Sequence, residues 1–181
     1  MILDVNTWGD SGYDLLKKWL ITIGVKTDDG IKIWHRKDYN GEEKMLKDFL
    51  EWFVINKERE IIGFNILKSD MPLLLLKSQS VGKTKELYQR LFKSNIVDLF
   101  CILTFLNNGT MCSLEMWCKK LDIVYKGKPK HPQTTSGKII FGTDHLINDQ
   151  DTLEYQKREL IATDELHQKI VELIKERYAI L

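Results

Sequence analysis

The spacing of apolar and polar residues predicts strands toward the amino terminus and mostly helices toward the carboxyl terminus. Short apolar runs bounded by turn residues are typical of strands, and they lie at residues 1–6, 20–25, 30–35, 60–64 and 95–100. Apolar residues at helical spacing predict helices over residues 42–55, 71–78, 99–107, 113–121 and 150–178, the last in two pieces. A hairpin of strands, followed by strands that alternate with helices, indicates an α/β fold whose mixed β-sheet is covered by helices.

Length and composition add few constraints to this picture. The chain has 181 residues, which suits a single domain over residues 1–181. A net charge of +1 gives no general attraction to nucleic acid, so such affinity has to come from a local patch. The three cysteines have no metal-type spacing, and the sequence shows neither a signal peptide nor an apolar run that could span a membrane. We therefore expect a soluble cytoplasmic protein without a membrane partner.

Residues 61–74 combine a short apolar strand, a polar turn and the start of a helix. Asp70 is a favoured N-cap residue, and Pro72 is tolerated in a first helical turn because its missing N–H would have no partner there. On this interpretation Asp70 serves only the backbone of its own helix. Other acidic residues in the chain suggest a second interpretation, a site for chemistry.

Acidic side chains are predicted to meet at one edge of the sheet. Asp4 and Asn6 lie two residues apart on the first strand and share a face, and Tyr155 and Glu159 lie four apart on one helical face. An Asp within an apolar strand is costly unless it is hydrogen-bonded or bound to a metal. Carboxylates from Asp4, Asp70 and Glu159 would suit Mg²⁺ or Mn²⁺, which prefer oxygen ligands.

Three motifs in chain order resemble those of the DnaQ-like 3′–5′ exonucleases. Residues 4–7 (Asp-Val-Asn-Thr) are similar to the family's Asp-x-Glu-Thr, and residues 63–74 (Gly-Phe-Asn-Ile-Leu-Lys-Ser-Asp-Met-Pro-Leu-Leu) to Gly-x-Asn-x-x-x-Phe-Asp-x-Pro-x-Leu. Residues 155–159 (Tyr-Gln-Lys-Arg-Glu) resemble Tyr-x-x-x-Asp, the third motif of the tyrosine subclass of the DEDD group. The proofreading domains of family B DNA polymerases are the nearest comparison.

The resemblance implies a ribonuclease H-like fold and a two-metal exonuclease. Such an enzyme hydrolyses phosphodiester bonds at the 3′ end of single-stranded DNA or RNA and releases nucleoside monophosphates. It implies Asp4, Asp70 and Glu159 as ligands of two Mg²⁺ or Mn²⁺ ions, Asn6 as a weak fourth ligand, and Tyr155 as the residue that orients the attacking water. A polymerase or another replication or repair protein is a candidate partner. The expected substrate contacts are Thr7, Trp8, Phe64, Asn65, Lys126, Lys128 and Lys130.

Three residues depart from the family pattern. Asn6 stands where the family has Glu, Glu159 where it has Asp, and Ser69 where it has an aromatic residue. The Asn removes a negative charge and the Glu adds a methylene, so we expect weakened metal binding; a ~1 Å misplacement can cost ~100-fold in rate. The alternative function is a catalytically degenerate relative that acts as a nucleic-acid-binding or protein-docking module.

Other residues give competing interpretations of the site. His145 could act as a base, as in a sister subclass, but the nearby acids do not have the required spacing, which favours a surface residue. Asp144, Asp149 and Asp151 could supply a metal ligand, although loop groups and helix N-caps are commoner for such positions. Tyr155 could equally be a half-buried helix aromatic. Phe64 could stack on a base or pack in the core.

Overall fold

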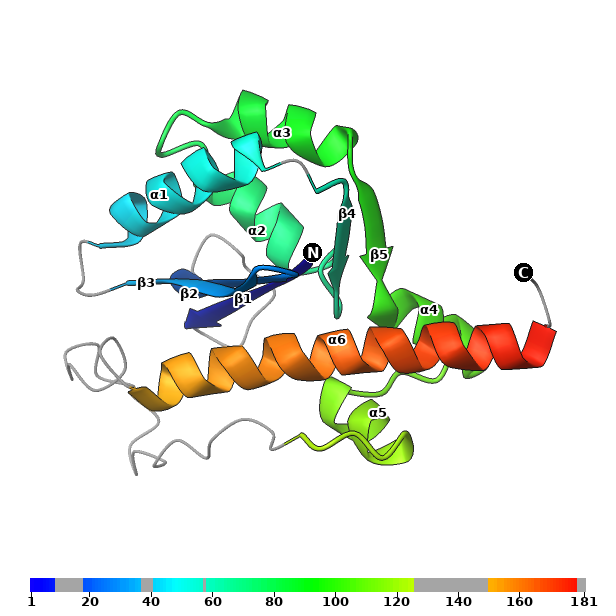
Figure 1. The fold of residues 1–181 in the computed structure, drawn as a ribbon. Coiled ribbons are helices and arrows are strands. Elements are labelled where there is room, and N and C mark those ends of the chain that lie inside the picture. Colours follow the sequence, from blue (N-terminus) through cyan, green and yellow to red (C-terminus); the bar gives the residue numbers. More distant parts are fainter. Residues whose placement is uncertain (9–17, 37–40, 57, 126–149, 179–181) are drawn as a thin grey trace.

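The computed structural model has one five-stranded mixed sheet with helices on both faces (Figure 1). It describes residues 1–8, 18–36, 41–56, 58–125 and 150–178. The sheet order is β3-β2-β1-β4-β5, in which β2 runs antiparallel to β1 and β3, while β1, β4 and β5 are parallel. The strands are β1 (Ile2–Trp8), β2 (Trp19–Thr27), β3 (Gly30–His35), β4 (Glu60–Gly63) and β5 (Asn95–Asp98). The predicted α/β fold, with a mixed sheet flanked by helices, is confirmed.

Six helices within the described ranges form two layers around this sheet. One buried cluster joins one face of the sheet to α1 (Glu42–Ile55), α2 (Asp70–Lys77) and α3 (Thr84–Phe92). A second buried cluster joins the other face to α4 (Leu99–Leu106), α5 (Leu114–Lys120) and α6 (Gln150–Tyr178). The alternation of β1 explains the division: Leu3 and Val5 enter the first cluster, and Ile2 enters the second. Asp4 and Asn6 therefore share the face that α6 covers.

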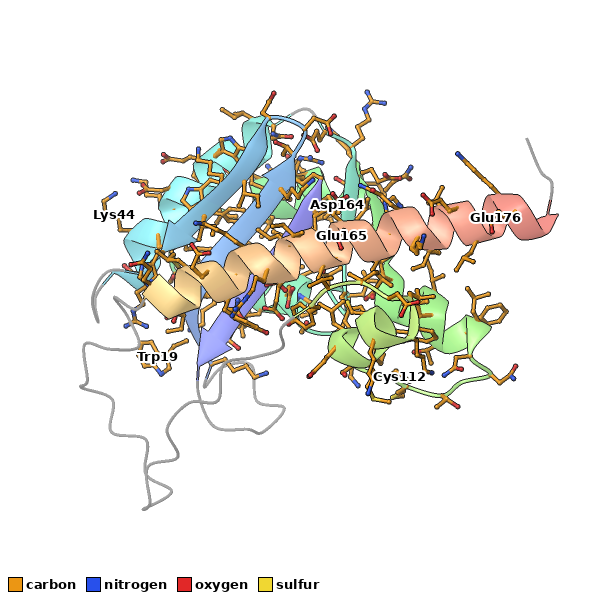
Figure 2. The ribbon with its side chains drawn as sticks, turned by 60° about the horizontal axis from the view of Figure 1, so that its bottom comes forward. Trp19, Lys44, Cys112, Asp164, Glu165 and Glu176 are labelled. Carbon is orange, nitrogen blue, oxygen red and sulfur yellow. The ribbon has the colours of Figure 1, made fainter. Side chains whose placement is uncertain are left out.

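The helices of the structure differ from the prediction in two places. The region 150–178 is one continuous helix of 29 residues, not two pieces. Figure 2, where Asp164 and Glu165 mark the middle of α6, shows this helix crossing the sheet. Helix α3 was not predicted, because only Leu87 and Leu91 of its nine residues are buried, which leaves a very narrow apolar stripe. None of the helices in the described part has the length and apolarity that a membrane crossing requires.

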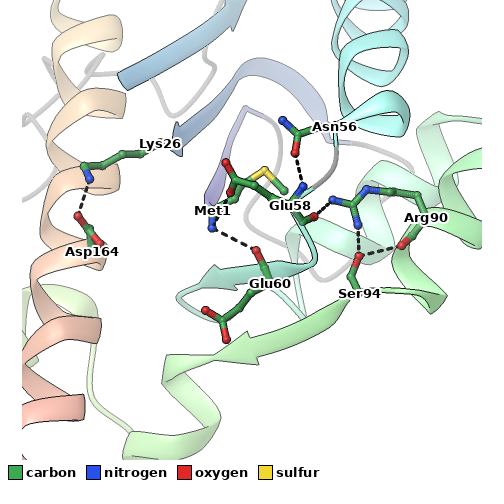
Figure 3. A network of polar contacts seen from close by, with 8 residues as sticks. All are labelled: Met1, Lys26, Asn56, Glu58, Glu60, Arg90, Ser94 and Asp164. Carbon is green, nitrogen blue, oxygen red and sulfur yellow. Dashed lines mark hydrogen bonds and ion pairs between the residues drawn. The ribbon is translucent and has the colours of Figure 1, made fainter. Parts of the chain in front are cut away.

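A polar network holds the chain together at the amino ends of the parallel strands (Figure 3). The Arg90 guanidinium of α3 donates to the carbonyls of Phe53, at the end of α1, and Glu58, and also to the hydroxyl of Ser94. Beside the start of β1, Lys26 Nζ of β2 lies 2.6 Å from Asp164 Oδ2 of α6. These contacts fix this end of the sheet and leave the carboxyl ends of β1, β4 and β5 for a pocket.

Candidate functional site

A pocket of about 540 Å³ opens where the parallel strands end. Ile2 pairs with Ile62 and β4 stops at Gly63, so Asp4 and Asn6 extend past the end of the neighbouring strand. The β1–β2 register shifts between Asn6 and Thr7, and such irregularities are common beside active sites. The polar lining of the pocket comprises Asp4, Asn6, Thr7, Lys18, Asn65, Ser69, Asp70, Ser113 and Glu159. Its less polar wall comprises Val5, Phe64, Leu73, Phe100, Met111 and Cys112.

The turn before α2 is shaped by the carboxylate of Asp98. Its Oδ1 accepts the N–H groups of Asn65 (2.9 Å) and Phe100 (3.0 Å), and its Oδ2 accepts that of Leu67 (3.0 Å). Asn65 adopts a φ of 63°, a left-handed conformation that Asn tolerates better than most residues. A Cβ at Gly63 would lie 2.8 Å from the Leu3 carbonyl and closer still to Ile66, so only glycine fits there. This turn places Phe64, Asn65 and Asp70 at the pocket.

Asp70 is the first residue of α2 and does not cap it. Ser69 occupies the N-cap position without a side-chain cap, so the interpretation of Asp70 as the N-cap is wrong. Asp70 Oδ1 instead accepts from the Ser69 hydroxyl at 2.7 Å, and the carboxylate also accepts the Val5 N–H. Its Oδ2 is buried and has no hydrogen-bond partner among the described residues. Burial raises the pKa of Asp70 to about 7.

Asp4 and Glu159 are the other two acidic residues of the pocket. Their carboxyl groups lie close enough to interact directly. Burial, followed by repulsion from Glu159 and Asp70, raises the pKa of Asp4 well above its usual range. The hydroxyl of Tyr125 donates to Glu159 Oε1 at 3.4 Å, and Tyr155 also hydrogen-bonds to Glu159. Burial raises the pKa of both phenols, so both remain neutral donors near neutral pH.

Gln156 of α6 connects the acidic pair to the sheet. Its side chain is fully buried, and its Nε2 donates to Asp4 Oδ2 at 2.6 Å. Its Oε1 accepts from Asn6 Nδ2 at 2.9 Å and from the Thr22 hydroxyl. A Cβ at Gly24 would lie 2.7 Å from the Gln156 amide, so the absence of a side chain at Gly24 makes room for it.

The structure brings most of the predicted site residues together. Asp4, Asn6, Asp70 and Glu159 all line the pocket, as do Thr7, Phe64 and Asn65. Tyr155 is buried, hydrogen-bonded to Glu159, and not among the described residues that line the pocket. Several predicted residues lie outside the described part of the chain, either entirely or in their side chains: Trp8, Lys126, Lys128, Lys130, Asp144, His145, Asp149 and Asp151.

Sequence reasoning did not identify Gln156, Tyr125, Lys18, Phe100 or Met111. A signal was available for Gln156: it precedes buried Leu160 by four residues, which places it on the buried face of α6. A buried amide needs partners, so its presence there indicates a polar network. The other four had no signal in the sequence, because their contribution depends on the tertiary packing.

The oxygen ligands at the pocket are of the kind that a hard divalent cation prefers, but they do not form a complete coordination shell. Within the described ranges, no group of three or more His, Cys, Asp or Glu side chains is arranged to hold a metal ion. Mg²⁺ commonly takes only one or two carboxylates and completes its shell with water and substrate phosphate. The unpartnered Asp70 Oδ2, beside Asp4 and Glu159, fits such a partial shell.

Comparison with known proteins supports the fold and no closer relationship. No protein-family model matches the chain, and no curated protein matches it in sequence. Among solved structures it is similar to a family B DNA polymerase from the hyperthermophilic archaeon Pyrobaculum calidifontis, with a TM-score of 0.61 and 13% sequence identity. The similarity covers 96% of this chain and 24% of the polymerase chain. At this identity the likeness shows a shared fold, over about a quarter of the polymerase's length.

Proposed function

We propose that the chain is a divalent-metal-dependent 3′–5′ exonuclease of the DnaQ-like type that acts on single-stranded nucleic acid. The observation that carries this proposal is the meeting of three carboxylates in one pocket. Asp4 comes from β1, Asp70 from α2 and Glu159 from α6, and one buried oxygen of Asp70 has no partner among the described residues. Buried carboxyl groups with raised pKa values in a pocket are typical of functional sites.

In the proposed reaction, a water oxygen attacks the terminal phosphorus while the bond from phosphorus to the 3′ oxygen breaks. The attacking water gives up a proton, the departing 3′ oxygen takes up a proton and becomes the 3′ hydroxyl of the shortened strand, and a nucleoside monophosphate leaves. The bound cation would polarise the phosphoryl group and lower the pKa of a coordinated water. Asp4, Asp70 and Glu159 would hold it, with the carbonyl oxygen of Asn6 as a weak additional ligand.

Tyr155, an aromatic pair and a lysine have further roles in the proposal. Tyr155 would orient the attacking water, a role supported by its hydrogen bond to Glu159. Phe64 and Phe100 have ring centroids 5.5 Å apart, and both line the pocket. An aromatic wall holds bases by stacking without selecting a sequence. Lys18 lines the same pocket and could contact a phosphate.

The test is an assay with 5′-labelled single-stranded DNA and RNA in the presence of Mn²⁺. We expect a ladder of products shortened from the 3′ end, and we expect its rate to fall at least ~100-fold in Asp4→Asn and Asp70→Asn. Asp48→Asn is the matched control, because Asp48 pairs with Lys44 on the exposed side of α1. Intact substrate at excess protein, or equal rates in the parent and Asp4→Asn, would contradict the proposal.

A catalytically silent nucleic-acid-binding or protein-docking module is the second candidate. The observation in its favour is the Gln156 amide, which donates to Asp4 Oδ2 at 2.6 Å and so takes up one lone pair of an expected metal ligand. This candidate predicts that labelled single strands bind equally well with Mn²⁺ and with EDTA and are not shortened. A polymerase or another replication or repair protein would then be the partner class to test by co-purification.

A further inference from the structure

A second hollow, of about 540 Å³, lies at the amino ends of β4 and β5, opposite the acidic pocket. Its lining residues come from the segments before these two strands: Asn56, Arg59, Arg90 and Lys93. Three of the four side chains are cationic, and none of the described residues that line it is acidic. The proposed reaction uses none of them. The charge of this cationic hollow suits an anionic ligand.

The polar groups of the cationic hollow are oriented to donate hydrogen bonds. A backbone N–H can only donate, and that of Glu58 donates to Asn56 Oδ1 at 2.9 Å. The amide nitrogen of Asn56 is therefore the atom left for a ligand. Arg90 makes three hydrogen bonds, one of them to the Glu58 carbonyl (Figure 3). A guanidinium carries five N–H donors, so two of those on Arg90 remain for a ligand.

The cationic hollow keeps a positive charge after its structural partners are counted. Arg59 and Lys93 are exposed, and neither side chain has a partner within the described part of the chain. The carboxyl ends of α1 and α3 meet here, and their dipoles together amount to about one negative charge, which Arg90 offsets. Glu58 pairs with the amino group of Met1 at 3.0 Å. The charges of Arg59 and Lys93 are thus left for a ligand.

The same helix exposes aromatic rings, which favour single-stranded nucleic acid as the ligand. Tyr88 and Phe92 of α3 are 59% and 79% exposed, and their rings stack with centroids 6.3 Å apart. Aromatic rings beside cations bind single strands because bases stack on the rings while the cations hold the phosphates. Phe92 directly precedes Lys93, so the aromatic pair reaches the end of α3 that lines the cationic hollow.

We propose that the cationic hollow binds the phosphate backbone of single-stranded nucleic acid. Arg59 and Lys93 contact phosphates, and Phe92 stacks on a base. This contact extends the proposed function to a part of the strand away from its 3′ end. The four residues of β4 separate the hollow from the acidic pocket by roughly 13 Å, which exceeds the ~3.4 Å rise of one stacked nucleotide. The inference concerns strand binding and does not require cleavage.

The test measures binding of a fluorescein-labelled single strand of ~20 nucleotides by anisotropy, between about 50 and 200 mM salt. EDTA is present so that no strand is shortened. We expect Arg59→Ala/Lys93→Ala to weaken binding roughly tenfold and to lower the slope of log affinity against log salt by about 1.4, since each phosphate contact contributes about 0.7. Phe92→Ala should weaken binding at least ~5-fold with an unchanged slope.

Matched controls come from other exposed positions, and Arg90 is left in place because it also holds the fold together. Lys44→Ala/Lys47→Ala removes the same charge from the exposed face of α1. Phe105→Ala removes a ring of α4 that is 83% exposed. Both controls should bind within ~2-fold of the parent, because exposed charges and rings away from the strand contribute little.

Unchanged affinity and salt slope in Arg59→Ala/Lys93→Ala would overturn the inference, as would a parent that binds no single strand. Calorimetry with inorganic phosphate is the second arm. Phosphate binding to the parent, combined with unchanged strand binding in the variant, would indicate a site for free phosphate only and would also overturn it.

The two proposals can fail separately. A parent that shortens strands, with a variant that binds them equally well, overturns this inference and leaves the exonuclease proposal standing. A parent that shortens nothing, with strand binding that depends on Arg59 and Lys93, overturns the exonuclease proposal and supports this inference.

Discussion

The carboxyl group of Asp70 keeps its proton to a higher pH in the folded protein than in the unfolded chain. Its pKa is about 7 in the folded protein, compared with an ordinary value of 3.8. Below about pH 4 both states carry the proton, so the contribution of Asp70 to stability is fully present and does not change with pH. Between about pH 4 and pH 7 only the unfolded state releases the proton, so the contribution of Asp70 falls by up to ~1.4 kcal/mol per pH unit as the pH rises.

The first prediction is that Asp70→Asn weakens this loss of stability with rising pH. The amide cannot ionise, so it has no titration to lose. In urea unfolding with EDTA, the free energy of unfolding of the parent should therefore fall relative to that of the variant between pH 5 and pH 7. Asp48→Asn, at an exposed position, should retain the slope of the parent. Identical slopes in the parent and Asp70→Asn would show that Asp70 is ionised in the folded protein throughout this range.

Asp98 is a structural carboxylate, and its substitution should affect the turn before α2. Asp98→Ala removes the acceptor of the Asn65, Leu67 and Phe100 N–H groups. We expect a loss of roughly 3 kcal/mol in urea unfolding, with faster hydrogen exchange at those amides. Asp48→Ala breaks only an exposed ion pair and should cost less than ~1 kcal/mol. Unchanged exchange in Asp98→Ala would contradict the assigned role.

At the scale of elements, Arg90 joins the end of α1, the segment before β4 and α3. Arg90→Met keeps an unbranched aliphatic side chain but removes the guanidinium, which lies over the Phe53 ring and donates to Phe53, Glu58 and Ser94. The two carbonyls lose a charged donor, so we expect about 2–3 kcal/mol of destabilisation in urea unfolding. Lys93→Met, at an exposed neighbouring position, should change stability by less than ~0.5 kcal/mol. Equal effects of the two variants would remove Arg90 from this role.

The order and type of the elements followed from local pattern, with informative failures. The hairpin at Asp29–Gly30 was predictable because Asp-Gly between apolar runs is a hairpin signal. In the structure Gly30 has a φ of 127°, which other residues rarely adopt. Helix α3 was not, because its exposed Tyr88 and Phe92 obscure a stripe of two leucines. Region 150–178 was expected in two pieces, but packing on the sheet and on α5 supports one helix where local pattern alone does not.

In the candidate site, the contributions of chain topology could be predicted from the sequence, whereas the side-chain contacts could not. The order of the strands brings Asp4 and Asp70 to one edge of the sheet, so their meeting could be anticipated from motifs and chain order. The contact of Gln156 with Asp4 joins residues 152 positions apart and depends on where α6 lies along the sheet. No local pattern encodes the position of α6 on the sheet, so the contacts of Gln156 with Asp4 and Asn6 were found only in the tertiary structure.

On the scale of the whole molecule, the pocket lies where α6 crosses the sheet. The helix is fastened to the sheet by Lys26–Asp164 at one edge and by Gln156 beside the pocket. Asp4, Asp70 and Glu159 come from three elements that separate when the chain unfolds. A cation bound by all three should therefore stabilise the complete fold and not only a loop.

The last prediction is a linkage between cation binding and global stability. Saturation to 100 times the dissociation constant should add about 2.7 kcal/mol to the free energy of unfolding. If Asp4, Asp70 and Glu159 hold the cation as proposed, they join β1, α2 and α6, so Mn²⁺ should slow hydrogen exchange of the most protected amides in all three elements together. Glu159→Gln removes the carboxylate supplied by α6 and should abolish most of this gain, whereas Glu172→Gln, on the exposed face of α6, should retain it. A gain confined to residues near Asp70, or one that persists in Glu159→Gln, would mean that the cation does not connect α6 to the sheet.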